Sequence, residues 1–235
     1  MDSGARSGNG LLASLNADDF DAIRPYLWTV ELLQGSTLLE LGETFKHAYL
    51  PHSGVISLVL GLQTGERIEV AMFGRDGILG VMGALGMPFA AANAVVLLPG
   101  MASIIEVDRL REAAERSATL RAILLRHGQL LLMQAMQAAG CNASHVVEAR
   151  LARWLLRVRD LAESNRFILT QELMAQMIGA RRNSVSIVAH TLQQAKYIRY
   201  SRGHVEVLDL DGLTSVACGC YAAGKAQYER LRSSI

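Results

Sequence analysis

Two arginines and an asparagine stand side by side in the last third of the chain, at Arg181, Arg182 and Asn183. An arginine guanidinium can form two hydrogen bonds with the edge of a guanine, and an asparagine amide can do the same with an adenine. If a helix begins at these residues, its N-terminal NH groups also favour a phosphate. The chemistry that these residues could do is therefore recognition of base pairs in the major groove of DNA.

The surrounding residues predict the helix-turn-helix that would present this group. Ala175 is the small residue that two closely crossing helices require, and Gly179, four residues later, tolerates the left-handed backbone of the turn. Apolar residues fall on the inward faces of both helices, at Met174, Ile178, Val185 and Val188. We expect the motif to span Gln171–His190, with Thr170 capping its first helix.

A strand pair is expected after this motif, within Ile198–Leu208, around a turn at Ser201–Gly203. Strands in this position form a wing that lies near phosphates, which position a protein without specifying sequence. The residues predicted to contact DNA are Thr170, Gln171, Arg181, Arg182, Asn183, Ser184, Ser186, Arg199 and Arg202. The alternative interpretation is an ordinary helical hairpin with a solvated arginine pair.

The distribution of charge agrees with this placement. The 235 residues carry a net charge of only +1. Residues 1–144 carry a net −4, whereas residues 145–235 carry a net +5, and 11 of the 13 basic residues in that second part are arginines. Any nucleic-acid contact is therefore expected in the C-terminal part of the chain.

The N-terminal half has a different texture. Asn16 is expected to cap a short helix, with Asp18 and Asp19 in its first turn. Between Thr29 and Val107, short apolar runs alternate with glycine-containing turns, and Leu60–Glu66 has the pattern of a hairpin. Short strands at such regular spacing predict a β-sandwich or barrel.

A long helix is expected next, because residues 110–139 are rich in strong helix formers and contain no proline. One face carries Leu120, Leu124, His127, Leu131, Gln134, Ala138 and Cys141, and a second face carries Leu125, Leu132, Met136 and Ala139. Two stripes indicate a helix that packs on its own domain and on a second copy of the chain. A core helix of a single chain is the alternative. Gly140–Ser144 is predicted to interrupt the helix and act as a hinge.

Several classes of protein are disfavoured. No apolar run approaches the roughly 20 residues of a membrane span, and we expect a cytoplasmic protein without a membrane partner. No nucleophile elbow, phosphate loop or paired carboxylates predict an enzyme. Cys218 and Cys220 are too close for a relaxed disulfide and lack the usual zinc spacing, so no metal site is predicted. A redox role for Cys141 and a haem or metal role for His127 stay open.

The chain resembles the Crp/Fnr family of bacterial transcription regulators from about residue 20 onward. The resemblance is strongest at Gly54–Leu60, Thr64–Ala71, Gly77–Gly80 and Leu169–Val185. It implies an α+β fold with an N-terminal double-stranded β-helix (jelly-roll-like) sensor domain, a long dimerisation helix and a C-terminal winged helix-turn-helix. It also implies a homodimer on palindromic double-stranded DNA, with half-sites about 34 Å apart. RNA polymerase is the further partner implied, and Arg182 matches the guanine-reading arginine of the family.

The domain boundaries expected from these patterns are a disordered tail at 1–15, the cyclic-nucleotide-binding-like sensor domain at 16–117, the dimerisation helix at 118–141, a hinge at 142–145 and the winged-helix domain at 146–235. The resemblance implies that the sensor domain modulates DNA affinity. A ligand-, haem- or redox-sensing module with weak DNA binding is an alternative function. A cyclic-nucleotide-responsive regulator with an atypical pocket is another.

The sensor departs from the family members that bind cyclic AMP, which carry a glutamate for the ribose and an arginine for the phosphate. No glutamate follows Gly80, and Ala91–Asn93 stand where the arginine is expected. A phosphate without a cation in an apolar pocket is costly, so cyclic-nucleotide binding is predicted to be weak or absent, with no cofactor required and an unknown small effector. The candidate effector pocket comprises Arg75, Ile78, Gly80, Ala91, Ala92, Asn93, Ala135 and Met136, with Arg75 as a possible substitute cation. The family's N-terminal iron–sulfur cysteines are absent.

Overall fold

The computed structural model describes residues 8–233, which divide into two compact units. The first unit comprises residues 8–58 and 72–133, and the second comprises residues 59–71 and 134–230. None of the helices in the described part of the chain has the length and apolar character that crossing a bilayer requires.

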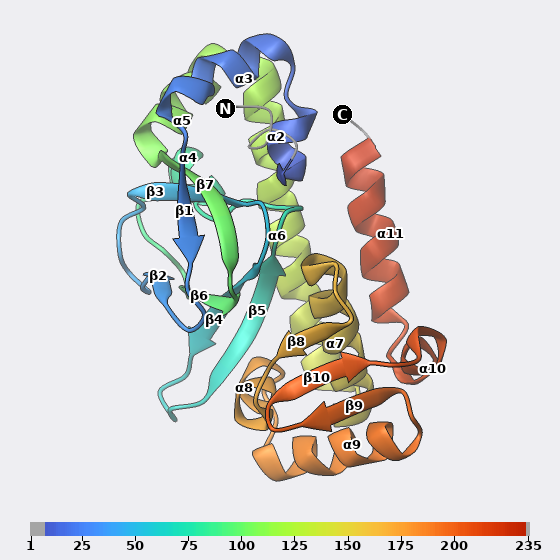
Figure 1. The fold of residues 1–235 in the computed structure, drawn as a ribbon. Coiled ribbons are helices and arrows are strands. Elements are labelled where there is room, and N and C mark those ends of the chain that lie inside the picture. The colour runs from blue at the N-terminus through green and yellow to red at the C-terminus, as the bar shows by residue number, and fades with distance from the viewer. Residues whose placement is uncertain (1–7, 234–235) are drawn as a thin grey trace. The chain divides into compact units, whose positions relative to one another are not determined.

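Two antiparallel sheets, apart from their residues within 59–71, form the centre of the first unit (Figure 1). One sheet has the order β1-β7-β3, with bounds β1 Trp28–Leu32, β7 Gly100–Glu106 and β3 His47–Pro51. The other has the order β2-β6-β4-β5, with bounds β2 Thr37–Leu39, β6 Asn93–Leu98, β4 Val55–Gly61 and β5 Arg67–Phe73. Strands of both sheets share one core, to which β1 contributes Leu32, β4 Ile56 and β6 Val96. The predicted jelly-roll-like architecture and the hairpin around residues 60–66 are therefore confirmed.

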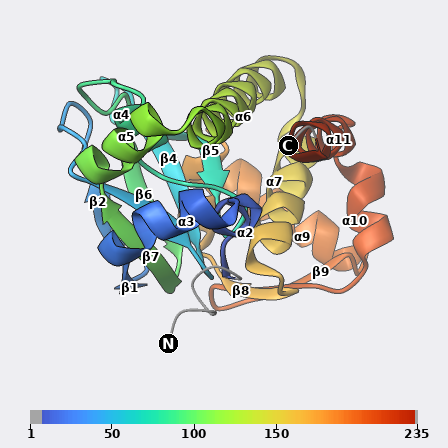
Figure 2. The ribbon, with the colours of Figure 1, turned by 90° about the horizontal axis from the view of Figure 1, so that it is seen from above.

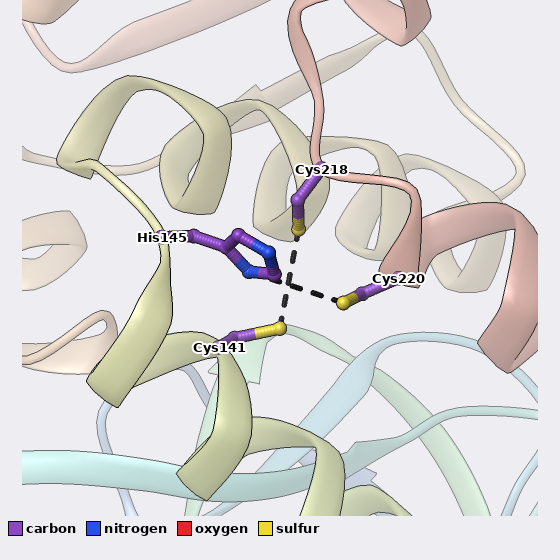
Figure 3. Close-up of side chains that lie close together, drawn as sticks. All are labelled: Cys141, His145, Cys218 and Cys220. Carbon is purple, nitrogen blue, oxygen red and sulfur yellow. Dashed lines mark hydrogen bonds between the residues drawn. The ribbon is translucent and has the colours of Figure 1, made fainter.

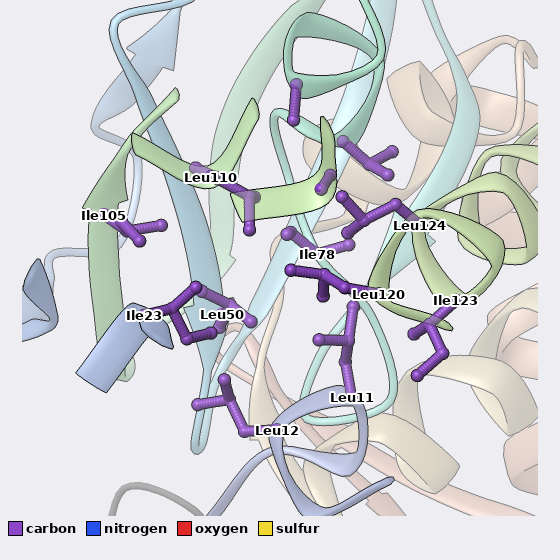
Figure 4. Packing of buried hydrophobic residues seen from close by; sticks show 14 of the residues in the cluster. Leu11, Leu12, Ile23, Leu50, Ile78, Ile105, Leu110, Leu120, Ile123 and Leu124 are labelled. Carbon is purple, nitrogen blue, oxygen red and sulfur yellow. The ribbon is translucent and has the colours of Figure 1, made fainter. Parts of the chain in front are cut away.

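Helices close one end of this unit. They are α2 Gly10–Ser14, α3 Ala17–Ile23, the 3₁₀ turn η1 Arg24–Tyr26, α4 Val81–Ala84, α5 Val107–Arg116 and the first part of α6 Ala118–Ser144. A second core joins them to the sheet, and it includes Leu12, Ile23, Leu50, Leu110 and Leu120 (Figure 4). Asn16 caps α3 by accepting a hydrogen bond from the Asp19 backbone, as its sequence position predicted.

The disordered tail predicted for residues 1–15 is wrong from residue 8 onward, while residues 1–7 lie outside the described residues. Asn9 caps α2 through Oδ1, and its Nδ2 donates to the carbonyl oxygens of Pro51 and Gly77, each at 3.0 Å. Leu11 and Leu12 are almost completely buried. The polar composition before Asn9 concealed this short anchor, whose stability comes from tertiary burial rather than from helix propensity.

Helix α6 continues through Gly140 to Ser144, so the interruption predicted at Gly140 is wrong. A glycine inside a helix costs only about 1 kcal/mol relative to alanine, which packing of the neighbouring turns can offset. The chain leaves helical geometry at His145 and Val146, just before α7 Val147–Ala162. The helix predicted for 118–141 thus ends three residues later, and the break lies at the end of the expected hinge.

The second unit contains the predicted helix-turn-helix and strand pair. Its elements after α7 are β8 Arg166–Ile168, α8 Gln171–Met177, α9 Arg182–Gln194, β9 Ile198–Ser201, β10 His204–Val207, α10 Leu210–Val216 and α11 Cys220–Ser233. The strands form an antiparallel sheet in the order β8-β10-β9, in which Val205 pairs with both Phe167 and Tyr200. Helix α7 packs against α9 and α10 (Figure 2).

Candidate nucleic-acid interface

Helices α8 and α9 meet at a turn whose backbone depends on Gly179. This residue has φ of +58°, a left-handed conformation that disfavours residues with a Cβ atom. Ala175 is buried where the helices cross, and Val185 is completely buried on the inward face of α9. Thr170 accepts a hydrogen bond from the backbone of Leu173 at 3.1 Å and thereby caps α8. Ala175, Gly179 and Val185 thus lie where the close crossing and the turn of the motif require them.

The outer face of α9 begins with the three residues that could read bases. Arg181 occupies the N-cap position of α9, and Arg182 and Asn183 form its first turn. All three are exposed, whereas Ala189 and Leu192 on the opposite face are buried. An amphipathic helix that leaves its arginine-bearing end open presents donors to a ligand outside the protein.

Two further predicted contact residues bond to one another. The Ser186 hydroxyl lies 2.6 Å from Gln171 Oε1 and donates to it, so the side chains of α8 and α9 are linked on this surface. Ser184, in the first turn of α9, is half-buried. This link orients the glutamine amide, whose two donor hydrogens remain directed away from Ser186.

Arg182 has a weak acidic neighbour. Its Nε lies 3.9 Å from Glu172 Oε2, and both side chains are more than half exposed. An exposed pair at such a distance contributes little to stability, at most about 1 kcal/mol. The guanidinium of Arg182 is therefore available to a stronger partner such as a guanine edge or a phosphate.

The strand pair carries a charge arrangement that sequence reasoning did not foresee. Glu206 on β10 binds Arg199 at 2.7 Å and Arg166 at 2.6 Å. A hydrogen bond and the positive charge from Arg166, together with Arg199, hold the pKa of Glu206 below its usual value. Arg199 is thus partly neutralised. Arg202, in contrast, lies exposed at the turn between the strands with φ of +48°.

Arg150 is a functional candidate that the sequence analysis missed. Its side chain is buried, and its guanidinium donates to the carbonyl oxygens of Asn142 at 3.1 Å and Ile178 at 2.9 Å. Burial lowers the pKa of Arg150, with a further contribution from the charge of Arg153. One arginine therefore joins the end of α6 to the turn of the helix-turn-helix. The available signal was a basic residue directly before the apolar run that α7 buries.

The predicted effector-pocket residues have mixed surroundings. Ile78 and Ala92 are buried, and Gly80 has φ of +90° with its backbone so close to β3 that a Cβ atom would lie 2.8 Å from the carbonyl oxygen of His47. Asn93 Oδ1 accepts a hydrogen bond from the Leu41 backbone at 2.9 Å. The amide oxygen of Asn93 is therefore engaged in holding a loop.

The remaining candidate pocket residues differ in their solvent exposure, and they belong to different structural units. Arg75 is half-buried, Ala91 is exposed, and both belong to the first unit. Ala135 and Met136 belong to the second unit, where the Met136 side chain is 66% exposed. Neither Ala135 nor Met136 has a side chain that forms strong hydrogen bonds with a ligand.

A cavity of about 860 Å³ opens elsewhere in the first unit. Its charged lining consists of Lys46, Glu106, Asp108 and Arg111, and none of the eight predicted effector residues borders it. Arg111 is paired with Asp108 at 3.0 Å and also donates to the carbonyl oxygen of Gly83. The two basic and two acidic side chains of the lining thus largely neutralise one another.

A β-sandwich unit followed by a winged helix-turn-helix defines a class of ligand-regulated DNA-binding proteins, and comparison with known families agrees. The model of the cyclic nucleotide-binding domain matches residues 29–117, and that of the Crp-like helix-turn-helix domain matches residues 149–216. The chain belongs to the Crp/Fnr family of transcription regulators. It is accordingly a DNA-binding regulator and not an enzyme.

Solved structures of this family have the same fold at low sequence identity. FixK2 from Bradyrhizobium japonicum matches with a TM-score of 0.71 and 15% identity, over 82% of this chain and 98% of FixK2. The c-di-GMP-responsive global regulator CLP from Xanthomonas campestris matches with a TM-score of 0.67 and 15% identity, over 82% and 99%. A Crp/Fnr-family regulator from Thermus thermophilus matches with a TM-score of 0.66 and 21% identity, over 81% and 98%. No curated protein sequence matches the chain.

Proposed function

We propose that this regulator binds a two-fold palindromic DNA site as a homodimer and reads each half-site with the N-terminal end of α9. The observation that carries the proposal is the exposure of Arg181, Arg182 and Asn183 at the start of a helix whose other face is buried. Arg182 is assigned to a guanine and Asn183 to an adenine, because these pairs form two hydrogen bonds each. Arg202 at the wing turn is assigned to a phosphate.

An exposed apolar stripe on α6 supports the homodimer. Leu125, Leu132 and Met136 are 55%, 60% and 66% exposed, and their spacing of seven and four residues places them on one face of the helix. Large apolar side chains in such a row are typical of a helix that pairs with a second helix. A second copy of α6 is the partner that the proposal assigns to this stripe.

The sensor unit is proposed to alter DNA affinity in response to a small effector other than a simple cyclic nucleotide. The resemblance to the family implies that Ala91–Asn93 stand where a phosphate-binding arginine is expected. The side-chain oxygen of Asn93 already accepts a hydrogen bond from the backbone of Leu41. An anionic phosphate would therefore lack a cation at these positions. Contact with RNA polymerase is part of the same proposal, since family members act on transcription.

A cyclic-nucleotide-responsive regulator with an atypical pocket is the second candidate, and the match of residues 29–117 to the cyclic nucleotide-binding domain favours it. Calorimetric titration with cyclic AMP, cyclic GMP and cyclic di-GMP separates the two candidates. We expect no saturable heat with the first two nucleotides. Tight binding of either one, with a change in DNA affinity, would replace the main proposal by this second one.

The proposed DNA recognition is tested by selecting bound duplexes from a random pool. We expect a palindrome whose half-sites are centred about one helical turn, roughly 34 Å, apart. The Arg181→Ala/Arg182→Ala double variant should enrich no sequence, while Arg116→Ala, an exposed arginine of α5, should select the wild-type motif. Selection of the same palindrome by the double variant would remove α9 as the reading element.

A further inference from the structure

Three cysteines and a histidine converge beside the end of α6 (Figure 3). Cys141 lies in the last turn of α6 and His145 directly follows this helix, whereas Cys218 lies between α10 and α11 and Cys220 begins α11. All four residues belong to the second unit. Their candidate ligand atoms, three Sγ atoms and one ring nitrogen, all lie within 4.8 Å of one another.

The spacing of these atoms fits a tetrahedron around one ion. Zinc binds thiolate sulfur at about 2.3 Å and imidazole nitrogen at about 2.0–2.1 Å, so the ligands of a tetrahedral site lie about 3.5–3.8 Å from one another. The Sγ atoms of Cys141 and Cys218 are 3.9 Å apart, and Cys220 Sγ is 3.9 Å from His145 Nδ1. Contraction by a few tenths of an ångström would bring both pairs to the edges of that tetrahedron.

Other uses of the cluster fit these distances less well. A disulfide requires two sulfur atoms about 2.05 Å apart, and all three cysteines are free thiols. An iron–sulfur cluster distributes its cysteine ligands over several iron atoms, so their sulfurs must lie further apart than around one ion. A closed set of three sulfurs and one nitrogen is instead the donor set of structural zinc sites.

We propose that Cys141, His145, Cys218 and Cys220 form a Cys₃His site for a single Zn²⁺ ion. His145 is assigned as a ligand through Nδ1, which is the ring nitrogen that faces Cys220. Four protein ligands leave no open position for water or substrate, so the site has a structural role. The ion would fasten the end of α6 to the start of α11, two segments separated by 77 residues between Cys141 and Cys218.

The charges around the cluster support an anionic metal complex. Three thiolates and one Zn²⁺ carry a net charge of −1, and a buried negative charge needs a positive neighbour. Arg153 interacts electrostatically with Cys218, and Arg150 does so with Cys141. Gln137 Nε2 lies 3.5 Å from Cys141 Sγ and donates to it. Hydrogen bonds of this kind orient and stabilise metal-bound sulfur.

The proposed ion lies next to the contacts that hold the helix-turn-helix. Asn142, which follows Cys141, accepts the hydrogen bond from Arg150 that also reaches Ile178 at the turn. Fixing Cys141 and His145 would therefore hold the backbone of Asn142 in position for Arg150. Loss of the ion is expected to loosen the end of α6 and to lower the thermal stability of the second unit.

Metal content and cobalt spectroscopy test the site on the full-length protein. Protein purified under reducing conditions should contain about one zinc ion per chain by elemental analysis. After removal of the metal, titration with Co²⁺ should produce the charge-transfer and ligand-field absorption of tetrahedral cobalt thiolate, with an end point at about one equivalent, and Zn²⁺ should abolish it.

Variants identify the ligands. Cys141→Ser, Cys218→Ser and Cys220→Ser should each weaken Co²⁺ affinity at least about tenfold and reduce the charge-transfer band. His204→Asn, an exposed histidine on β10, should retain the wild-type spectrum. His145→Cys should retain one equivalent of cobalt with a stronger charge-transfer band. A merely structural role of His145 would not produce that gain. Circular dichroism identifies variants that fail to fold.

Four results would overturn the proposal. The first is a reduced, folded protein that gives no thiolate band with Co²⁺, and the second is a band that survives in Cys218→Ser/Cys220→Ser. The third is iron with inorganic sulfide in the purified protein, which would establish a cluster instead. The fourth is a Cys141–Cys218 disulfide found by mass spectrometry in place of the metal. All four readouts are independent of DNA binding.

Discussion

Arg182 is the residue on which sequence-specific binding depends most in this account. Its side chain is 68% exposed and has only a distant ion pair with Glu172. Arg182→Ala should weaken binding to the selected palindrome by about 1–3 kcal/mol per half-site, since a guanidinium with two hydrogen bonds to guanine contributes that much discrimination. Competition binding measures this loss, and Arg116→Ala serves as the matched control. An unchanged preference for the guanine position would contradict the assignment.

Glu206 partly neutralises the positive charge of Arg166 and Arg199 in the wing. Glu206→Gln should free Arg166 and Arg199, raise affinity for DNA of any sequence and steepen its dependence on salt. Because the pKa of Glu206 is lowered in the folded protein, its ion pairs stabilise the wing above the ordinary carboxyl pKa and are lost as the pH falls through the lowered value. The wild type and Glu206→Gln should therefore differ in DNA affinity and in thermal stability at neutral pH. Both quantities should become similar in acid, where Glu206 is protonated. A wing that tolerates Glu206→Gln without any change in salt dependence would show that these arginines do not approach phosphates.

Residues close together in the sequence were the ones that could be predicted. Arg181, Arg182 and Asn183 belong to one helical turn, so composition and spacing were sufficient to place them on one surface. The role of Arg150 depends on its hydrogen bonds to Asn142 and Ile178, which lie 8 and 28 residues away along the chain. The cysteine cluster depends on the contact between Cys141 and Cys218, which are 77 residues apart. Cys141 in the last turn of α6 and His145 directly after this helix are four residues apart, and this spacing was the available signal for the cluster. Nothing local connects this pair to Cys218 and Cys220, because only the fold brings residues 77 positions apart together.

At the scale of elements, the N-cap of α8 contributes to the stability of the helix-turn-helix. Thr170 Oγ1 accepts from the Leu173 backbone at 3.1 Å. Thr170→Ala should destabilise the second unit by about 0.5–2 kcal/mol, whereas Thr170→Ser keeps the oxygen and should remain close to wild type. Thermal unfolding measures both. Equal stability of the two variants would mean that the cap contributes nothing.

Helix α6 provides the element-level test of the homodimer. Replacing Leu125 and Leu132 with glutamate puts two charges on the exposed stripe and should convert a dimer into a monomer, as measured by analytical ultracentrifugation. Arg116→Glu, an exposed change on α5, should leave the dimer intact. A wild-type protein that sediments as a monomer, or a double variant that stays dimeric, would exclude this helix face as the interface.

The faces of the long helix could be predicted from the sequence, whereas one short helix and the full length of α6 could not. The two faces assigned to the long helix have different environments, with Leu120 and Leu124 buried and Leu125 and Leu132 exposed. Periodicity carries this information because it is local. The helix over residues 10–14 and the continuity of α6 through Gly140 were missed, because burial of Leu11 and Leu12 and packing around Cys141 outweigh the weak local signals.

At the scale of the whole molecule, the acidic and basic parts of the sequence correspond approximately to the two units. The first unit has the two-sheet core of a cyclic nucleotide-binding domain, and the second has the Crp-like helix-turn-helix. The candidate DNA-contacting residues could be predicted, because base recognition by a helix uses a few defined side chains on one of its faces. The effector could not, because the alanines and the asparagine at Ala91–Asn93 carry no charge that would indicate the kind of ligand.

The central claim is that α9 gives this regulator its sequence specificity. The most direct test is the ratio of affinities for the selected palindrome and for a scrambled duplex of equal length, measured at one salt concentration. We expect a ratio of at least about 10³ for the wild type and a ratio near one for Arg181→Ala/Arg182→Ala. A double variant that is folded and retains the wild-type ratio would contradict the account.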